Sequence, residues 1–272
     1  MSESRASPGP AQTVGRAVQL LRLVASSRVR NLRLIDLAEM ASLDKSTTHR
    51  LLQRLVQERM LVRDPGTHGY WLGPLLHELG LAALPESNLR ELAHRDLETL
   101  ARSTGDMTFL LRRSGFESVC VSRIAGNFAI QTMTQGEGDR HPLGMGAGGL
   151  AILAALPDAE IDIVLKGVSP QMRRYRLSEK AMRQRILQTR TSGFAIDEGS
   201  SASDVTAIGR AVRDKSGTVL GAVFVASIRS RMVESRLRVV DRNLVNCVTA
   251  IETRLATYRL ATIVREPLPP LE

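Results

Sequence analysis

The sequence predicts an α+β protein in which an N-terminal winged helix-turn-helix precedes a larger domain with a mixed, largely antiparallel sheet. Residues 34–55 have the pattern of two short helices joined by a tight turn, and residues 61–73 have the pattern of two short strands around a turn. From residue 105 onward, strand-like pairs are mixed with helices without a regular βαβ repeat, which favours antiparallel pairing. A length of 272 residues allows about two domains.

The segment 34–55 organises the first domain. Its first helix spans 34–41 and a turn follows at Ser42-Leu43, where Ser42 replaces the more usual glycine. Asp44 then stands where its carboxylate can accept hydrogen bonds from the free N–H groups of the second helix. Apolar or small residues recur at intervals of three and four on both helices, which predicts buried stripes. These are Leu34, Leu37 and Ala38 on the first helix and Thr48, Leu51, Leu52 and Leu55 on the second.

The opposite face of the second helix is polar and cationic. Hydrogen-bond donors, small hydroxyls and positive charge are what a helix needs to read base edges and contact phosphates in a major groove. We therefore expect this face to bind double-stranded DNA. The alternative is an ordinary amphipathic hairpin whose charges are only solvated. The residues of this face are Lys45, Ser46, Thr47, His49, Arg50, Gln53 and Arg54.

A wing is predicted directly after the second helix. Residues 61–63 and 70–72 are strand-like, and Asp64-Pro65-Gly66 between them has strong turn chemistry. We expect Trp71 to pack inward and the tip of the wing to lie along the DNA backbone or in a minor groove. The residues of the wing that we expect to contact DNA are Arg63, Thr67 and His68.

Three further segments complete the N-terminal part. Residues 1–12 are expected to be disordered, and a helix from about Thr13 to Ala25 carries Arg16 and Arg22 off its apolar face. A helix from Leu75 to Leu84 is predicted to have a tightly packed face, and Pro85 ends it. That face consists of Leu76, Leu79 and Gly80. The next helix, 86–103, is expected to be a linker and dimerisation element, or else a helix that packs only on its own chain.

The second domain is predicted to alternate strands and helices. We expect strands at 107–111, 118–124, 128–134, 194–197, 207–213 and 219–227. We expect helices that begin near 150 and 158, a charged helix over 178–192 with Met182, Ile186 and Leu187 inward, and a long last helix over 234–260. The segment 214–217 has the sequence of a hairpin turn.

Composition narrows the class of protein. A formal charge of +9 and a pI of about 10.4 suggest a polyanionic partner. No apolar run approaches the roughly 20 residues of a membrane span, and the polar N-terminus is not a signal peptide. The two cysteines and five histidines form no paired metal motif. We therefore expect a reduced, cytoplasmic protein without a cofactor, a metal site or a membrane partner.

One glycine-rich stretch competes with this interpretation. Residues 144–149, Gly-Met-Gly-Ala-Gly-Gly, fit the pattern G-x-G-x-x-G. A dinucleotide fingerprint needs a strand directly before it and a carboxylate about 20 residues later. Residues 138–142 precede the stretch and Leu165-Lys166-Gly167 stands at the later position, so we favour a sharp backbone turn that starts a helix. An enzyme with a cofactor on the Gly144–Gly149 loop remains the alternative.

The chain resembles the IclR (isocitrate lyase regulator) family of transcriptional regulators over nearly all of residues 13–262. In the first half, the resemblance rests on TVGRAVQLLRLVA, LIDLAEMASLDKSTTHRLLQRLVQERMLVRD and GYWLGPLLHELG. In the second half, it rests on HPLGMGAGG, SGFAIDEG and VTAIGRAVRDKSGTVLGAVFVAS.

The resemblance implies a ligand-responsive repressor or activator of a catabolic or metabolic operon. It implies a homodimer or dimer of dimers on a pseudopalindromic promoter site. The implied domains are a tail (1–12), a winged helix-turn-helix (13–84), a linker helix (85–104), a GAF-like effector-binding domain (105–262) and a second tail (263–272).

Site residues are carried over by position. Lys45, Ser46, Thr47, His49 and Arg50 fall on the family's recognition helix. Arg16 matches a basic residue that opens the first helix, and we expect it to contact phosphate. The effector pocket is implied to lie against the sheet under the loop 145–149. Its lining positions fall on Ile130, Ala147, Gly148, Asp197, Val205, Ala207, Phe224 and Ala226.

Several pocket positions depart from the family pattern. A frequent Cys is Ala207, two small hydroxyl residues are Phe224 and Ala226, a usual His is Gly144, and a familiar Pro is Ala211. These changes make the pocket more apolar than one built for a small oxo-acid. We therefore expect a larger aromatic or aliphatic effector with Asp197 as a polar anchor. In the first domain, Arg33 replaces a capping Ser or Thr, which suits a phosphate better than a helix dipole.

Overall fold

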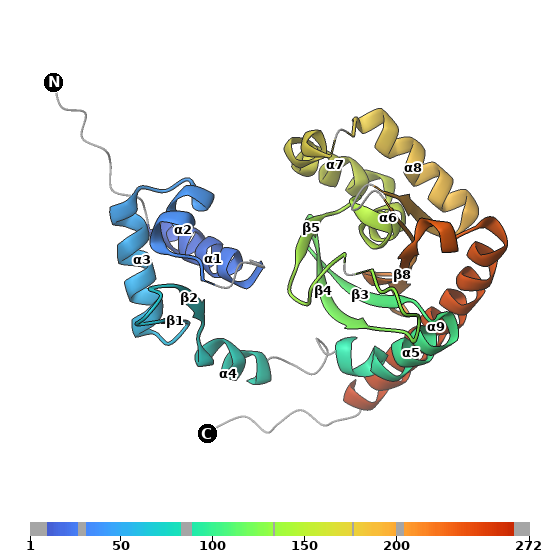
Figure 1. The fold of residues 1–272 in the computed structure, drawn as a ribbon, viewed down its shortest axis with the longest axis horizontal. Coiled ribbons are helices and arrows are strands. Elements are labelled where there is room, and N and C mark those ends of the chain that lie inside the picture. Colours follow the sequence, from blue (N-terminus) through green and yellow to red (C-terminus); the bar gives the residue numbers. More distant parts are fainter. Residues whose placement is uncertain are drawn as a thin grey trace. The chain divides into compact units, whose positions relative to one another are not determined.

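The computed structural model of the chain divides into two compact units, Met1–Ser87 and Asn88–Glu272, which are described separately (Figure 1). The structure describes residues 10–26, 31–82, 89–132, 134–175, 177–199 and 204–263. The expected disordered tail 1–12 lies largely outside the described residues, but residues 10–12 are helical, which corrects its boundary. The tail 263–272 lies outside them beyond residue 263. Among the described residues, none of the helices combines the length and the apolar character needed to cross a bilayer.

The first unit is a small helical domain with a two-stranded antiparallel hairpin. Its core is built from Leu20, Leu37, Leu52, Leu61 and Tyr70, which come from three helices and both strands. The elements are α1 (Pro10–Ser26), α2 (Leu34–Ala41), α3 (Lys45–Gln57), β1 (Leu61–Arg63), β2 (Tyr70–Leu72) and α4 (Pro74–Ala82). The predicted helix-turn-helix and wing are therefore present at the predicted places.

The turn between α2 and α3 forms without a glycine. Ser42 has φ 55° and ψ 41°, the left-handed conformation that ends a helix, and its N–H donates to Glu39 O at 3.0 Å. Leu43 N donates to Ala38 O at 2.9 Å, which closes the last turn of α2. At the start of α2, the backbone N–H of Arg33 donates to Asp36 Oδ2 at 2.8 Å. Asp36 thereby offsets the unfavourable cation at this helix start.

Two packing predictions in the first unit are wrong. Trp71 is 40% exposed, whereas Tyr70 is buried and its N–H donates to Leu32 O at 2.9 Å. Adjacent strand residues point to opposite faces, so burying Tyr70 turns Trp71 outward. The expected packed face of α4 is likewise not found, because no residue of this helix is buried and Leu79 is 51% exposed.

The second unit is a six-stranded sheet with helices on both faces. The strand order is β5-β4-β3-β8-β7-β6, and every pair of neighbours is antiparallel. The strands are β3 (Met107–Ser114), β4 (Glu117–Ile124), β5 (Arg140–Pro142), β6 (Ala195–Glu198), β7 (Val205–Arg213) and β8 (Val219–Ile228). The helices are α5 (Leu89–Thr104), α6 (Gly146–Ala154), α7 (Asp158–Arg174), α8 (Glu179–Ser192) and α9 (Glu234–Ile263), and a short 3-10 helix, η2, spans Arg229–Arg231.

Alternation along the strands divides the side chains between two cores. On β7, Ala207 and Ala211 face the core under α6, α7 and α8, whereas Ile208 and Val212 face the core under α5 and α9. Figure 1 shows α5 and α9 packed side by side on their face of the sheet. The helix expected as a linker therefore packs, from Leu89 onward, within the core of the second unit.

The predicted strand over 128–134 is wrong for its described residues. The neighbour of β4 is instead β5, and just before β5 the chain is already bonded to β4 through Gly138 N and Cys120 O at 2.7 Å. Phe128 takes part in another arrangement, in which the Arg231 guanidinium lies 3.9 Å from the centroid of its ring. The prediction that Leu187 points inward is also wrong, because α8 buries Met182, Ile186 and Thr189 and leaves Leu187 66% exposed.

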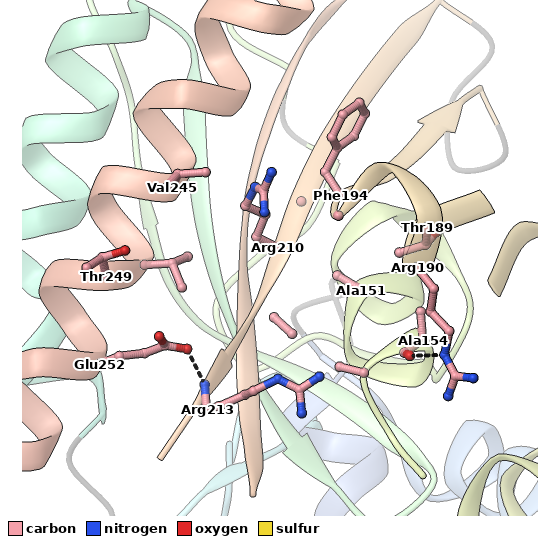
Figure 2. Close-up of a pocket in the computed structure, with 15 residues that line it drawn as sticks. Ala151, Ala154, Thr189, Arg190, Phe194, Arg210, Arg213, Val245, Thr249 and Glu252 are labelled. Atoms are coloured by element: carbon pink, nitrogen blue, oxygen red, sulfur yellow. Dashed lines mark hydrogen bonds between the residues drawn. The ribbon is translucent and has the colours of Figure 1, made fainter. Parts of the chain in front are cut away.

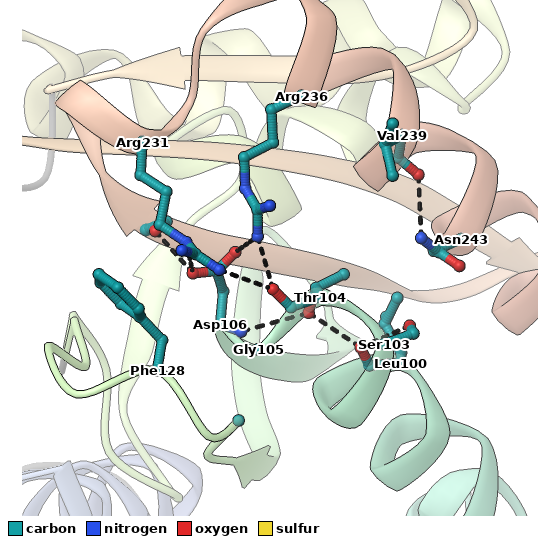
Figure 3. A network of polar contacts seen from close by, with 12 residues as sticks. Leu100, Ser103, Thr104, Gly105, Asp106, Phe128, Arg231, Arg236, Val239 and Asn243 are labelled. Atoms are coloured by element: carbon teal, nitrogen blue, oxygen red, sulfur yellow. Dashed lines mark hydrogen bonds and ion pairs between the residues drawn. The ribbon is translucent and has the colours of Figure 1, made fainter.

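A buried carboxylate explains the path around Phe128. Asp106 is 1% exposed and accepts hydrogen bonds from Ser227 Oγ at 2.7 Å, Arg231 Nε at 2.9 Å and Arg236 Nη2 at 2.8 Å (Figure 3). Three donors, two of them cationic, compensate the buried charge. The cluster joins the start of β3 to the start of α9, and Arg231 presents its other surface to Phe128.

Candidate nucleic-acid interface and ligand pocket

The expected DNA-binding face of α3 is exposed, and it is held in place by a buried opposite face. Thr48, Leu52 and Leu55 are buried, and Thr48 Oγ1 donates to Asp44 O at 2.9 Å. This bond explains how a hydroxyl residue serves as an anchor in an apolar stripe. Six of the predicted reading residues are exposed and Thr47 is half-buried. The six are Lys45, Ser46, His49, Arg50, Gln53 and Arg54.

Asp44 caps the N-terminus of α3 as predicted. Its Oδ1 accepts from Thr47 N at 2.8 Å and from Ser46 Oγ at 2.7 Å. These two bonds, the backbone one first, hold the pKa of Asp44 well below its ordinary value of 3.8. The carboxylate therefore fixes the first turn of α3 and orients one of the hydroxyls expected at the DNA.

The other residues predicted to contact DNA differ in exposure and in charge pairing. Arg54 is paired with Glu58, the residue that directly follows α3, so its charge is partly compensated. Arg16 on α1 is half-buried. Arg63, Thr67 and His68 of the wing are exposed.

The tip of the wing is shaped by one carboxylate and one residue in the left-handed region. Asp64 Oδ1 accepts from Thr67 N at 2.7 Å and from Gly66 N at 2.9 Å, which lowers the pKa of Asp64. His68 follows with φ 60°. The turn thus presents Thr67 and His68 at the end of the hairpin.

In the second unit, six of the eight expected ligand positions line one cavity. The cavity measures only about 10 Å³, about the space of one water molecule. The six positions are Ala147, Gly148, Asp197, Val205, Ala207 and Phe224. Ile130 is 55% exposed and does not line it, and Ala226 is buried in the core rather than in the cavity wall.

Three lining residues were missed from the sequence. Gly146 begins α6, and Thr134 and Gln135 lie in or directly after the segment predicted as a strand. Gln135 is 7% exposed, and its Oε1 is buried without a hydrogen-bond partner among the described residues. A buried, unsatisfied amide oxygen is unusual and marks a position where a ligand can donate a hydrogen bond. The polar character of the residues directly before Gly136 was the sequence signal that could have indicated these lining positions.

The polar anchor Asp197 is already paired. Its Oδ1 lies 2.9 Å from Arg185 Nη2, with the carboxylate side chain 5% and the guanidinium side chain 20% exposed. Arg185 also donates to Ile196 O at 3.3 Å. The pocket therefore contains a compensated acid rather than a lone negative charge.

The departures at Gly144 and Phe224 have a physical basis. Gly144 has φ 89°, and a Cβ there would lie 2.7 Å from Met182 Cε, so the space of a side chain is already filled. Phe224 stacks on Phe109 with ring centroids 4.5 Å apart and lines the pocket. A Cβ at Gly148 would lie 2.8 Å from Phe224 Cδ1, which requires glycine in this turn of α6.

The stretch Gly144–Gly149 lacks the surroundings of a dinucleotide site. The strand before it, β5, is a three-residue edge strand that pairs antiparallel with β4. Within the described residues, no parallel strand follows α6, whereas a dinucleotide fingerprint needs a βαβ unit. The glycines instead place the start of α6 against Leu111 and Phe224.

Comparisons with known proteins agree for both units. Residues 13–65 match the IclR helix-turn-helix domain, and residues 81–253 match the family described as bacterial transcriptional regulator IclR C-terminal. The chain is 31% identical over 225 residues to the glycerol operon regulatory protein of Streptomyces griseus, covering 81% of this chain and 86% of the relative. It is 29% identical over 231 residues to the regulator XynR of Escherichia coli, covering 83% and 90%.

Solved structures share the fold. An IclR transcriptional regulator from Alicyclobacillus acidocaldarius superposes with a TM-score of 0.74 at 20% identity, covering 90% of this chain and 99% of that one. An IclR homolog from Microbacterium hydrocarbonoxydans, solved in complex with 4-hydroxybenzoate, gives 0.68 at 21% identity, covering 89% and 98%. The chain therefore belongs to the IclR family of bacterial transcriptional regulators, and it is a DNA-binding regulator rather than an enzyme.

Proposed function

We propose that the chain acts in the cytoplasm as a homodimer or dimer of dimers on a pseudopalindromic promoter site, and that a hydroxylated aromatic acid is its effector. The observation that carries the effector proposal is the meeting of six expected pocket positions at one cavity beside the Arg185–Asp197 pair.

The DNA contacts are proposed from exposure and chemistry. His49 and Arg50 project from the exposed face of α3, where a guanidinium can donate two hydrogen bonds to one guanine edge. Lys45 and the wing residue Arg63 carry positive charge for phosphates, which fix position without reading sequence. The remaining proposed contacts are Arg16, Ser46, Thr47, Arg54, Thr67 and His68.

The effector class follows from the lining of the pocket. Ala147, Val205, Ala207 and Phe224 offer apolar surface for a ring, and Gln135 Oε1 offers an unused acceptor for a hydroxyl. The Arg185 guanidinium, which Asp197 Oδ1 holds in place, can pair with a carboxylate on the effector. The relative solved with 4-hydroxybenzoate holds a molecule that carries both groups.

The closed pocket has a consequence for mechanism. A space of about 10 Å³ cannot hold a ring, so effector binding must select a conformation in which the pocket is open. The apparent affinity for effector is then reduced by the fraction of molecules in the open form. Opening of the pocket is the change that we propose to be coupled to DNA affinity.

The test is a DNA titration with the full chain. A labelled duplex from upstream of the regulated operon is compared with a scrambled duplex at several salt concentrations, with and without 4-hydroxybenzoate. We expect tighter binding to the upstream duplex, a steep loss of affinity with salt, and a shift in affinity on adding the acid. Equal affinity for both duplexes would contradict the proposed DNA contacts, and an unchanged affinity with the acid would contradict the proposed effector class.

A further inference from the structure

A second, larger cavity lies in the same unit, away from the pocket around Asp197. It measures about 440 Å³ and lies between α9 on one side and α6 and α8 on the other (Figure 2). Binding sites for small molecules have typical volumes of about 300–1,000 Å³. No residue lines both this cavity and the small pocket. We propose that this cavity is a second ligand site, which binds an amphipathic organic monoanion.

The cavity exists because two neighbouring strands have different lengths. β6 pairs with β7 only as far as Gly209, which is the partner of Ala195. The rest of β7, from Arg210 to Arg213, therefore has no described strand on that side. The chain before β6 turns away at Gly193, where φ is 80° and α8 ends. The cavity beside the end of β7 therefore results from the difference in length between β6 and β7.

The walls offer apolar surface on two sides. Ala151 and Ala154 of α6 have small side chains that leave space. Phe194, which packs against the core under α5 and α9, also lines the cavity. Val245 of α9 lies on the opposite wall (Figure 2), and Val248 of the same helix also lines the cavity. A short alkyl chain or a ring can lie between these walls.

Two of the three arginines at the cavity are already compensated. Arg190 donates to Ala154 O at 2.8 Å and to Leu156 O at 2.7 Å, and pairs with Asp158 at 2.6 Å. Its guanidinium therefore completes the C-terminal end of α6. Arg210 makes two bonds to Asp241, at 2.6 and 2.9 Å. Because both guanidinium groups already pair with carboxylates, neither is well suited to bind an anionic ligand.

Arg213 is different. Its Nη1 donates to Gly217 O at 3.2 Å, and no ion pair among the described residues involves it. The residue is exposed at the cavity, at the end of β7. An exposed guanidinium next to apolar walls is suited to pair with the charged end of an amphipathic anion. The positive charge of Arg213 therefore predicts that the ligand carries a negative charge.

The position of Glu252 favours a small molecule over a peptide strand as the ligand of this cavity. Its Oε1 accepts from Arg213 N at 2.8 Å, so the outward N–H at the end of β7 is occupied (Figure 2). An added strand would need that N–H, and a carboxylate at an edge discourages strand addition. Glu252 also repels an anion at Arg213. The affinity for an anion is thus set by two opposing charges, which can be varied separately.

The experiment uses the full chain, sodium octanoate as the probe, and octanamide as its uncharged counterpart, with binding measured by titration calorimetry. We expect octanoate to bind and octanamide to bind more weakly. Arg213→Gln should weaken octanoate binding about tenfold, as expected for a lost hydrogen bond between charged groups. Glu252→Gln keeps an acceptor for Arg213 N and should strengthen binding severalfold. Thr249→Trp, at an exposed position of the cavity, should abolish binding.

Two control variants test whether octanoate binds at this cavity and not elsewhere on the chain. Arg242→Gln removes an exposed cation of α9 that does not line the cavity and should change nothing. Asp197→Asn alters the other pocket and should also leave octanoate binding unchanged, so the result does not depend on the proposed effector site. The proposal is overturned if octanoate fails to bind, if octanamide binds equally well, or if folded Arg213→Gln or Thr249→Trp protein retains wild-type affinity.

Discussion

Arg185 and Asp197 form an ion pair, with Nη2 of the arginine 2.9 Å from Oδ1 of the aspartate, and it joins α8 to β6 inside the second unit. The carboxylate side chain is only 5% exposed. A buried charge that loses its partner is costly, so each residue depends on the other. The pair also borders the small pocket, which connects the stability of this region to ligand binding.

The first prediction concerns this pair. Asp197→Asn should remove the effect of effector on DNA binding while the affinity for DNA without effector stays at the wild-type level. The reason is that the change alters the polar anchor of the pocket, whereas the proposed DNA contacts belong to the first unit. Effector dose–response curves on the upstream duplex measure it, with the exposed neighbour change Glu198→Gln as the control. An unaltered dose response would place the effector elsewhere.

The second prediction concerns base reading by α3. Arg50→Ala should lower the free energy of specific DNA binding by about 1–3 kcal/mol if the guanidinium reads a base edge. Binding to a scrambled duplex should change much less. Arg238→Ala is the matched control, because it removes the same charge from an exposed ion pair on α9. A loss that is equal on both duplexes would reassign Arg50 to a phosphate contact.

The third prediction is a pH dependence from the cap of α3. The pKa of Asp44 is lowered in the folded chain, so its contribution to stability is present above its ordinary value of 3.8 and is lost as the pH falls below that value. Asp44→Asn keeps a capping side chain without this titration. The difference in melting temperature between the wild type and Asp44→Asn should therefore stay constant from pH 7 to about pH 5 and narrow progressively as the pH falls towards 3.

Fluorescence makes this measurement specific to the first unit. Trp71 is the single tryptophan of the chain and lies in β2. Asp44→Ala, which removes the cap altogether, should melt at a lower temperature than Asp44→Asn at pH 7. A constant difference between the wild type and Asp44→Asn over the whole pH range would show that the carboxylate charge does not stabilise the helix.

Local chemistry accounts for the parts of the fold that the sequence predicts well. The cap at Asp44, the periodic stripe of α3 and the turn at 214–217 are each specified by residues close together in the chain. The same holds for the start and end of α8, where Ser178 caps and Gly193 has φ 80°. Such signals need no knowledge of the tertiary structure.

The sequence predictions fail where residues that are distant in the chain determine the local structure. The sequence of residues 128–132 is typical of a strand, but the Phe128 ring packs against the Arg231 guanidinium, which Asp106 holds in place. The edge of β4 where a further strand could pair is occupied by β5. Gln135 was missed as a pocket residue for the same reason. Six pocket positions could be carried over from the family resemblance, because they lie on regular elements whose register is fixed. Ile130 was not, since it lies in an irregular segment.

The last prediction separates backbone strain from crowding at the loop over the small pocket. Gly144 and Gly217 both have a positive φ, 89° and 82°, but only Gly144 is enclosed: a Cβ there would lie 2.7 Å from Met182 Cε and 3.1 Å from Leu153 Cδ2. At Gly217 nothing lies within 4 Å. Gly217→Ala should therefore cost only the left-handed conformation, about 1–2 kcal/mol of unfolding free energy. Gly144→Ala should cost clearly more, because Met182 is fully buried and has little room to move. Chemical denaturation followed by circular dichroism measures both variants, and equal losses would mean that Met182 and Leu153 adjust freely and that the glycine is required for its conformation alone.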